Sequence, residues 1–307
     1  MAYGQDLAAQ QSGRYTLAPD PAGKTVLDAG GKPVLTYLTS KPAGIPLDGE
    51  NACCFHPLTT PLGEAVTAIA PADHPDHRGV FFAWLNLEFR RPSGVVRGDF
   101  WGWGRFAPTM GRLIRNREIR LVKADNASAV IEIVNRWEIG GETMMNEINT
   151  ARTTVSKGAR VLDLIYRFEP TAGDIVVAQA AFSGLCVRSR SDGEAAYANE
   201  QGPVDLPDSN ALKPEMNWPA SSWYSRSLHL KNGKTITAAV ADHPSNPEST
   251  WHEPRPVAFL NPCVSALRPV RIPEKQPLTL KYRVIAMDGD VNPSVIGDLA
   301  KEWRASG

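Results

Sequence analysis

The sequence lacks a long hydrophobic run and an excess of charge of either sign. Its most apolar stretch, residues 175–187, is interrupted by Gln179, Ser183 and Gly184, whereas a helix that spans a bilayer needs roughly 20 apolar residues. Lysine plus arginine and aspartate plus glutamate number 33 each, without long runs of one sign. Nucleic acids and membrane surfaces are bound through basic patches, so the sequence predicts neither as a partner. Residues 1–13 lack the basic start and apolar core of a signal peptide, which leaves the compartment open.

Cysteine is scarce as well, with four residues and no Cys-x-x-Cys pair. The neighbouring Cys53 and Cys54 would point to opposite faces of an extended strand, so a thiolate zinc site is not expected. Cys186 and Cys263 lie within apolar runs. We expect them to be small buried hydrophobic residues, since free cysteine is among the most frequently buried residue types.

Helical periodicity is rare in this chain. Twenty-five prolines are spread along it, which argues against long helices. One helix is predicted at the end of the sequence, at about residues 293–304, where Asn292 can cap the first turn and Pro293 suits its first position. The apolar stripe of this helix consists of Val295, Ile296, Leu299 and Trp303.

Alternation of apolar and polar residues with the strand period of two is abundant. The segments that show it are 25–27, 33–38, 80–89, 112–122, 129–139, 161–168, 175–187, 223–230, 235–241 and 278–286. Gly30-Gly31 and Asn232-Gly233 supply the positive φ of tight hairpin turns. The pattern predicts an all-β fold, a large antiparallel two-sheet β-sandwich with one C-terminal helix, in a single domain over residues 1–307. The polar, weakly periodic segment 189–222 is expected to be a long loop excursion.

Histidine is concentrated in short polar segments that contain proline. The tripeptide Asp-His-Pro occurs twice, at residues 73–75 and 242–244. An imidazole can give and take a proton near neutrality, and Asp73, Asp76 and Asp242 are placed to orient nearby rings. A single Asp-His-Pro tripeptide is most simply explained as an Asx-type turn with an exposed histidine. Two of them, each followed by polar and aromatic residues, favour at least one functional histidine.

These motifs carry a family resemblance. The order His56-Pro57, then residues 73–79, then Gly98-Asp99-Phe100-Trp101 resembles a bacterial family of unassigned function often labelled methane oxygenase PmoA. Residues 242–247, 251–252, 259–262 and 280–290 look like the second half of that family, so the resemblance covers about residues 50–290. Residues 87–97 depart from it as an apparent insertion.

The resemblance implies a β-sandwich similar in shape to galactose mutarotases and a setting in bacterial carbohydrate catabolism. It does not imply methane oxidation, because the membrane monooxygenase subunit of that name is built of spanning helices. Sugar sites combine a flat aromatic platform with side chains that hydrogen-bond hydroxyl groups. The motifs supply both kinds of residue.

We therefore predict a sugar-active enzyme without a cofactor that uses a histidine pair for general acid–base chemistry on a small carbohydrate, by epimerisation, mutarotation, elimination or hydrolysis. The predicted catalytic residues are His77, His243 and His74. The predicted substrate-binding residues are His56, Arg78, Asp99, Trp101, Asn246, Trp251 and His252. The hypothesis places the loops 73–78 and 242–252 at one pocket, with His77 and His243 as the pair that transfers protons.

Two alternatives stay open at this point. His74, His77 and Asp76 are of the types that bind zinc, iron or copper, as in a metal-dependent oxidoreductase or hydrolase. A non-catalytic carbohydrate-binding protein would instead depend on its tryptophans and bind with little change between about pH 5 and 8, where a histidine pair would change charge.

Overall fold

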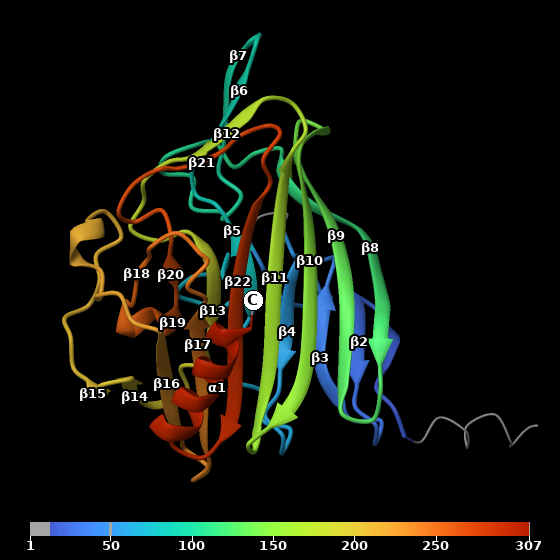
Figure 1. Ribbon diagram of the computed structural model, residues 1–307, viewed down its shortest axis with the longest axis vertical. Helices are drawn as coiled ribbons and strands as arrows, with labels where there is room; N and C mark the ends of the chain where they lie inside the picture. Colours follow the sequence, from blue (N-terminus) through green and yellow to red (C-terminus); the bar gives the residue numbers. More distant parts are fainter. Residues whose placement is uncertain (1–12, 49–50, 307) are drawn as a thin grey trace, which may run out of the picture.

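Two large antiparallel sheets make up most of the molecule in the computed structural model, which describes residues 13–48 and 51–306 (Figure 1). The nine-stranded sheet contains, in spatial order, β15 (Gly202–Val204), β14 (Gly193–Asn199), β16 (Trp223–Leu230), β17 (Thr235–Asp242), β22 (Leu278–Asp288), β11 (Ala159–Pro170), β10 (Glu142–Ser156), β9 (Ser128–Ile139) and β8 (Arg112–Ala124). The seven-stranded sheet contains β1 (Thr16–Asp20), β2 (Gly23–Leu27), β3 (Pro33–Leu38), β4 (Cys54–Leu58), β5 (Val80–Ala83), β13 (Gly184–Arg188) and β19 (Phe259–Leu260). The predicted all-β sandwich is confirmed.

Smaller elements cover the ends of the sandwich. A four-stranded sheet consists of β21 (Val270–Ile272), β12 (Asp174–Val177), β6 (Leu87–Arg91) and β7 (Gly94–Gly98). A two-stranded ladder pairs β18 (Thr250–Trp251) with β20 (Pro262–Cys263), and short 3₁₀ turns occur at η1 (Pro214–Met216) and η2 (Arg255–Val257). The hairpin of β6 and β7, which contains the apparent insertion, projects from the body of the molecule (Figure 1).

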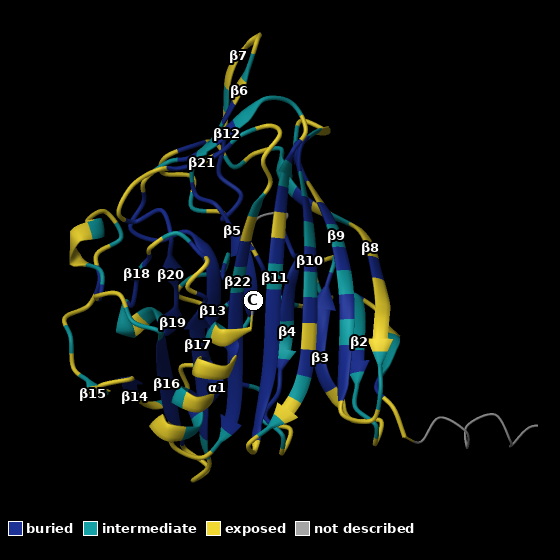
Figure 2. Cartoon of the chain, in the orientation of Figure 1, coloured by how far each residue is buried: buried dark blue, intermediate teal, exposed yellow. Residues whose placement is uncertain are grey.

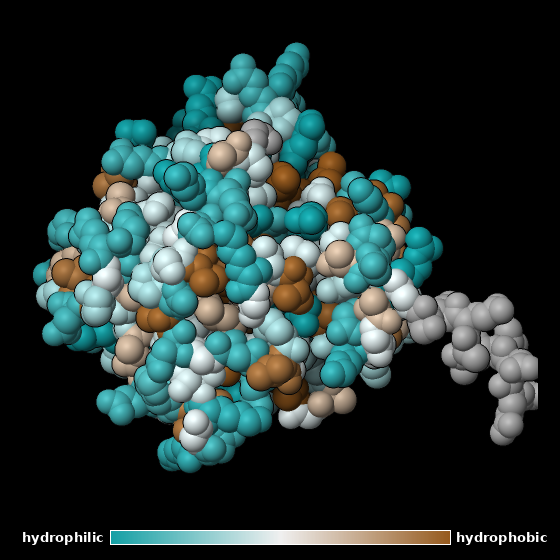
Figure 3. Space-filling view, turned by 60° about the horizontal axis from the view of Figure 1, so that its bottom comes forward, coloured by the Kyte–Doolittle hydropathy of each residue, from teal (hydrophilic) through white to brown (hydrophobic). Residues whose placement is uncertain are grey.

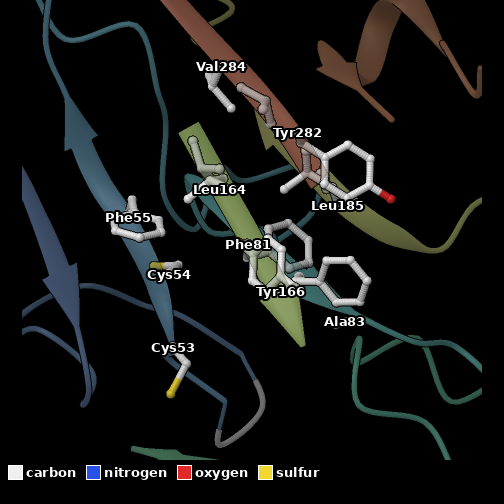
Figure 4. Close-up of a cluster of buried hydrophobic side chains, with 14 of the residues drawn as sticks. Cys53, Cys54, Phe55, Phe81, Ala83, Leu164, Tyr166, Leu185, Tyr282 and Val284 are labelled. Carbon is white, nitrogen blue, oxygen red and sulfur yellow. The ribbon is translucent and has the colours of Figure 1, made fainter. Parts of the chain in front are cut away.

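The core lies between the two sheets, where strand residues alternate between the inner and outer face. Figure 2 shows buried residues alternating with less buried ones along long strands such as β9 and β10. In the part of the core drawn in Figure 4, Phe55 and Phe81 of one sheet lie near Leu164, Tyr166 and Tyr282 of the other, and all five side chains are almost fully buried. All four cysteines are buried and free, which confirms the prediction for Cys186 and Cys263.

The predicted C-terminal helix is α1 (Pro293–Ala305), capped by the Asn292 side chain, which accepts a hydrogen bond from the Val295 N–H. Its apolar stripe packs on the outer face of the nine-stranded sheet (Figure 1). This second core contains Ile296, Leu299 and Trp303 of the helix with Val161, Ala239 and Ile285 of the sheet. None of the helices in the described residues has the length and apolar composition needed to cross a membrane.

The strand boundaries differ from the sequence prediction in several places. Segment 80–89 divides into β5 and β6, where the chain leaves the seven-stranded sheet for the four-stranded one, and segment 175–187 divides into β12 and β13, where it returns. Segment 189–222, expected to be a loop, contains β14 and β15 at the edge of the nine-stranded sheet. Both predicted hairpin turns are present, with φ of 78° at Gly31 and 81° at Gly233.

The strand β10 was not predicted, because polar residues occupy its inward positions. Glu147, Asn149 and Thr153 are buried there. The carboxylate of Glu147 accepts hydrogen bonds from Asn135 (2.9 Å) and from the indole N–H of Trp137 (2.7 Å). Burial raises the pKa of Glu147 to about 7. These hydrogen bonds satisfy the buried carboxylate of Glu147 and so lower the cost of placing a polar face in the core.

Candidate functional site

Histidine, aspartate and aromatic side chains meet in one cavity near the β13 and β19 edge of the seven-stranded sheet. Its walls consist of His74, Asp76, His77, Trp101, Trp103, Phe182, Ser209, Ala211, His252, Pro254, Val257 and Phe259. The cavity has a volume of about 140 Å³ and is open to solvent on one side. A dry protein cavity of about 150 Å³ holds a benzene ring, so this one has room for a single six-membered ring.

The loop 71–79 carries three of these residues and is shaped by backbone hydrogen bonds. The His77 N–H donates to the His74 carbonyl (3.0 Å), and the Gly79 N–H donates to the Ala68 carbonyl (2.8 Å). Gly79 has φ of 54°, and a Cβ there would lie 2.2 Å from the Phe55 carbonyl oxygen, so the close approach requires glycine. The loop places His77 at the base of the cavity and His74 at its mouth, with the two rings stacked at 4.7 Å.

His77 is held as a neutral imidazole with a defined tautomer. The Arg188 guanidinium, which can only donate, lies 3.4 Å from the His77 Nδ1, so that nitrogen accepts and the proton resides on Nε2. Burial, reinforced by the neighbouring Arg188 charge, lowers the pKa of His77 to about 2. The Nε2 atom lies 4.0 Å from the nearest carboxylate oxygen of Asp76. His77 therefore provides a hydrogen-bond donor without charge.

His252 has the opposite tautomer. The Asn217 Nδ2 donates to the Ala181 carbonyl (2.7 Å) and to the Thr250 hydroxyl (3.1 Å), which fixes the orientation of that amide. The Asn217 Oδ1 then accepts from the His252 Nδ1–H at 2.9 Å. The His252 Nε2 is left as an acceptor, and burial lowers the pKa of this imidazole to about 3. The cavity thus combines a neutral donor from His77 with a neutral acceptor from His252.

Asp73 links the mouth of the cavity to a buried cation. The fully buried Arg188 side chain donates through one nitrogen to both Asp73 carboxylate oxygens at 2.8 Å. The His74 Nδ1 also lies 3.0 Å from Asp73, so it donates to the carboxylate and His74 offers Nε2 to its surroundings. Partial burial raises the pKa of Asp73, but hydrogen bonds from His74 and Arg188 outweigh it and hold the pKa below its ordinary value.

Asp76 is the second carboxylate of the loop and lines the cavity itself. Burial raises its pKa above the ordinary value, although the positive charge of Arg78 opposes the shift. The pKa values of Asp73 and Asp76 are therefore shifted in opposite directions, although the two residues are only three positions apart. Asp73 is held ionised by a buried arginine, whereas Asp76 retains a proton more readily.

Aromatic side chains form the remaining walls. Trp101 contacts His77 edge to face at 5.9 Å and Phe182 at 5.1 Å. Phe182 stacks on His252 at 5.1 Å and contacts Trp103, also at 5.1 Å. Trp103 is more exposed than Trp101, which is fully buried. The polar groups are thus surrounded by apolar ring faces.

A model of one protein family matches residues 24–301 of this sequence. The chain belongs to DUF6807, a family of unknown function. The comparison with curated proteins finds no match. The family model leaves the activity open, so the cavity has to be interpreted from its own chemistry.

Several solved structures are similar to this DUF6807 chain. The GH36 α-galactosidase AgaB from Geobacillus stearothermophilus has a TM-score of 0.43 and 10% identity, over 91% of this chain and 39% of that one. A galactose mutarotase related enzyme from Lactobacillus acidophilus has a TM-score of 0.37 and 6% identity, over 90% and 97%. A polysaccharide lyase has a TM-score of 0.36 and 10% identity, over 91% and 33%. This chain spans about two fifths of the α-galactosidase. Because these TM-scores lie below 0.5, the neighbours do not identify its substrate.

Arg78 and Asp99, predicted to bind substrate, lie behind the cavity wall of the DUF6807 chain. Arg78 is buried and donates to the carbonyl oxygens of Asp76 (3.0 Å) and Trp101 (3.2 Å). The carboxylate of Asp99 accepts backbone N–H groups of the same loop, at residues 101, 102 and 104. Both side chains hold the loop that carries Trp101.

The second Asp-His-Pro segment lies outside the cavity. His243 and Asn246 line a separate hollow beside α1, together with Arg304. The His243 Nε2 donates to the Ser306 carbonyl (3.0 Å), and its Nδ1 accepts from the Ser245 hydroxyl (2.7 Å). His77 and His243 therefore do not lie at one pocket as predicted. His243 instead forms a hydrogen bond at the end of the C-terminal helix. His252 is the histidine of the second loop that lines the cavity with His77, and both rings contact Phe259.

Trp251 and His56 also lie elsewhere. Trp251 is fully buried and packs edge to face on Tyr224 at 5.0 Å, so it belongs to the core. The His56 Nδ1 lies 3.0 Å from the Thr67 hydroxyl, and burial lowers the pKa of His56 to about 4. Neither side chain lines the cavity.

The metal alternative has little geometric support in the part of the chain that the structure describes. There, no three histidine, cysteine, aspartate or glutamate side chains are grouped so that they could hold one ion. Of the proposed ligands, His74 uses its Nδ1 for Asp73, and the Nδ1 of His77 accepts from Arg188.

Sequence reasoning missed Arg188, Asn217 and Phe182. Arg188 comes from the end of β13, which pairs with β5 directly after the histidine loop. Asn217 lies in the segment interpreted as a loop excursion, and Phe182 lies in an apolar run. None of the three is near a motif; strand pairing brings Arg188 to the histidines, and Phe182 and Asn217 come from irregular segments that the tertiary fold places there.

Proposed function

We propose that this chain is a carbohydrate-active enzyme that holds one sugar ring in the cavity and moves protons to and from it. The observation that carries the proposal is the convergence of His74, Asp76, His77 and His252 with an aromatic wall in a space of one ring. A sugar ring has hydroxyl groups at its edge and apolar C–H groups on its faces, and both find partners here.

The two locked histidines act in binding. A sugar hydroxyl is both a donor and an acceptor, so it accepts from the Nε2–H of His77 and donates to the Nε2 of His252. Both imidazoles are neutral over the physiological pH range, because their pKa values are lowered to about 2 and about 3. Binding through them therefore needs no charge on the ligand.

Proton transfer is assigned to His74 and Asp76. His74 donates its Nδ1–H to Asp73, which leaves its Nε2 as a base at the mouth of the cavity. Asp76, with its pKa raised by burial, is suited to deliver a proton. A base and an acid beside one ring support ring opening, epimerisation or elimination of a sugar. The reaction class is thus proton transfer on a small carbohydrate.

The test is a panel of neutral monosaccharides and uronic acids, followed by NMR in D₂O. Saturation-transfer spectra report binding, while exchange between anomers and deuterium incorporation report catalysis. Asp76→Asn should keep binding and lower the catalysed rate about 100-fold or more, the usual contribution of one general acid or base. His243→Ala is the matched control, because that histidine lies in a different hollow, and its rate should equal that of the unmodified protein.

The results of these experiments separate a catalytic role from sugar binding alone. An unchanged rate in both Asp76→Asn and His74→Ala would remove the catalytic assignment. Binding that depends on Trp103, without any catalysed exchange, would identify the non-catalytic carbohydrate-binding alternative.

A further inference from the structure

A second hollow adjoins the cavity and shares Ala211 with it. This groove has a volume of about 500 Å³ and opens to solvent. Its walls consist of Phe106, Gln179, Ala180, Ala181, Ala211, Leu212, Pro214, Glu215, Ala266 and Leu267. Eight of these ten residues are apolar, and the groove lacks the histidines that the cavity carries.

The groove gathers apolar side chains that are exposed to solvent. Of the ten exposed large hydrophobic residues in 13–48 and 51–306, Phe106, Leu212 and Leu267 line it, and Met216 lies on the adjoining η1 turn. Exposed apolar residues are normally scattered, whereas clusters mark binding sites. On the face of the molecule drawn in Figure 3, apolar residues form small separate patches within a mostly hydrophilic surface.

The groove lies directly beside the cavity. Phe106, in the groove, packs edge to face on Trp103 of the cavity wall at 5.4 Å. Ala181 of the groove precedes Phe182 of the cavity, and Trp103 contacts Phe182. A substituent on a ring in the cavity would have to extend past Ala211 to reach the groove.

We propose that the groove binds an apolar aglycone, an aryl or alkyl group attached to the sugar in the cavity. The inference rests on the proposed function and specifies its substrate class as glycosides. A second sugar would need several hydrogen-bond partners, but the polar side chains here are Gln179, whose amide nitrogen already donates to the Ala266 carbonyl (2.8 Å), and Glu215. The carboxylate of Glu215 disfavours an anionic substituent.

The dimensions of the groove agree with a small occupant. A standard protein interface engages about 20–30 residues on each side, whereas ten residues line this groove. The groove also adjoins the cavity at Ala211 and at the Trp103–Phe106 contact, so a ligand of the cavity is the occupant nearest to it. An aglycone is the occupant that accounts for both features.

The experiment compares methyl and phenyl glycosides of the sugar that binds most tightly in the panel, in saturation-transfer NMR titrations. Burial of a phenyl group in an apolar groove should tighten binding about tenfold or more relative to methyl. Leu212→Asp and Leu267→Asp should each remove most of this gain and leave methyl glycoside binding unchanged. The matched control is Leu62→Asp, at an exposed leucine outside the groove, with folding checked by circular dichroism.

The outcomes separate the two proposals. Equal affinity for methyl and phenyl glycosides overturns the aglycone inference and leaves the sugar cavity in place. A gain of the same size from a second sugar as from phenyl also overturns it, because the groove would then recognise a glycan. If Leu62→Asp also removes the tighter binding of the phenyl glycoside, that binding does not depend on the groove, and the inference is overturned too. If no glycoside and no free sugar binds, the inference falls together with the proposed function.

Discussion

At residues 73–75 the aspartate faces the buried guanidinium of Arg188, whereas at residues 242–244 the aspartate accepts hydrogen bonds from uncharged side chains. The backbone nevertheless forms the same kind of hydrogen-bonded turn in both places. The His77 N–H donates to the His74 carbonyl, and the Asn246 N–H donates to the His243 carbonyl. In each case proline is the second residue of a β-turn, a position that its fixed φ favours.

The comparison shows what the repeated tripeptide encodes. It encodes a turn, and the surroundings of the turn decide what the histidine does. In the first segment His74 stacks on His77 at the mouth of a cavity. In the second, both ring nitrogens of His243 are used within the protein, by Ser245 and Ser306.

The largest expected contrast is between the tryptophans that follow the two segments. Trp251→Ala should lower the free energy of unfolding by about 3–5 kcal/mol, because it empties a fully buried site in the core. Trp103→Ala should lower it by less than half as much, since Trp103 is partly exposed, but it should weaken sugar binding. Urea denaturation with ligand titrations measures both. If Trp251→Ala weakened sugar binding and spared stability, the assignment of the two tryptophans would be reversed.

The second largest contrast is expected between the stability effects of replacing Asp73 and Asp242. Asp73→Asn removes the carboxylate opposite a buried arginine and should cost about 2 kcal/mol, less than for a fully buried pair because the Asp73 side chain is 43% exposed. In Asp242→Asn the cost should be about 1 kcal/mol, close to one hydrogen bond, because burial raises the pKa of Asp242 to about 6 and makes its charged form less favourable in the folded state than that of Asp73. Chemical denaturation at pH 7 gives both values. Equal losses would mean that the Arg188 charge has no special dependence on Asp73.

Much of the fold followed from sequence patterns, and the exceptions have physical reasons. Hairpins with Gly30-Gly31 and Asn232-Gly233 were predictable because the turn chemistry is local. The strand β10 was hidden because its inward positions carry Glu147 and Asn149 in place of apolar residues. Their acceptability depends on partners such as Trp137, on another strand. No local pattern reveals such a pairing.

The site was predictable in part. The loop of His74, Asp76 and His77 was found from its composition. The partner across the cavity was assigned to His243, although the structure places His252 there. Trp251 and His252 are neighbours on an extended segment, so their side chains point to opposite sides. Once Trp251 is known to enter the core, His252 must face away from it, but that requires the tertiary structure.

The third prediction concerns pH. The folded-state pKa of His77, about 2, lies below the unfolded value of about 6.5, so the stability that its neutral form contributes is complete above about pH 6.5 and is lost as the pH falls. His77→Asn keeps an acceptor for Arg188 and cannot titrate. It should therefore reduce the slope of unfolding free energy against pH by up to about 1.4 kcal/mol per unit below pH 6.5.

His243→Asn is the control for this measurement, because its ring is less buried and its pKa is lowered mainly by that partial burial. Its effect on the slope should be smaller than that of His77→Asn. Denaturant titrations at intervals from pH 7 to pH 4.5 give the slopes. Identical slopes for the unmodified protein and His77→Asn would show that His77 is protonated in the folded state.

The smallest expected effect concerns the helix α1. His243→Ala removes the hydrogen bond to the Ser306 carbonyl and the edge contact with Trp303. It should lower the free energy of unfolding by about 1 kcal/mol and increase hydrogen exchange in the last turn of α1. The other tripeptide supplies the matched variant, His74→Ala, which should leave α1 unchanged and alter only the cavity. The division of roles between the two turns would be contradicted if hydrogen exchange in α1 became faster in His74→Ala, or if it did not become faster in His243→Ala.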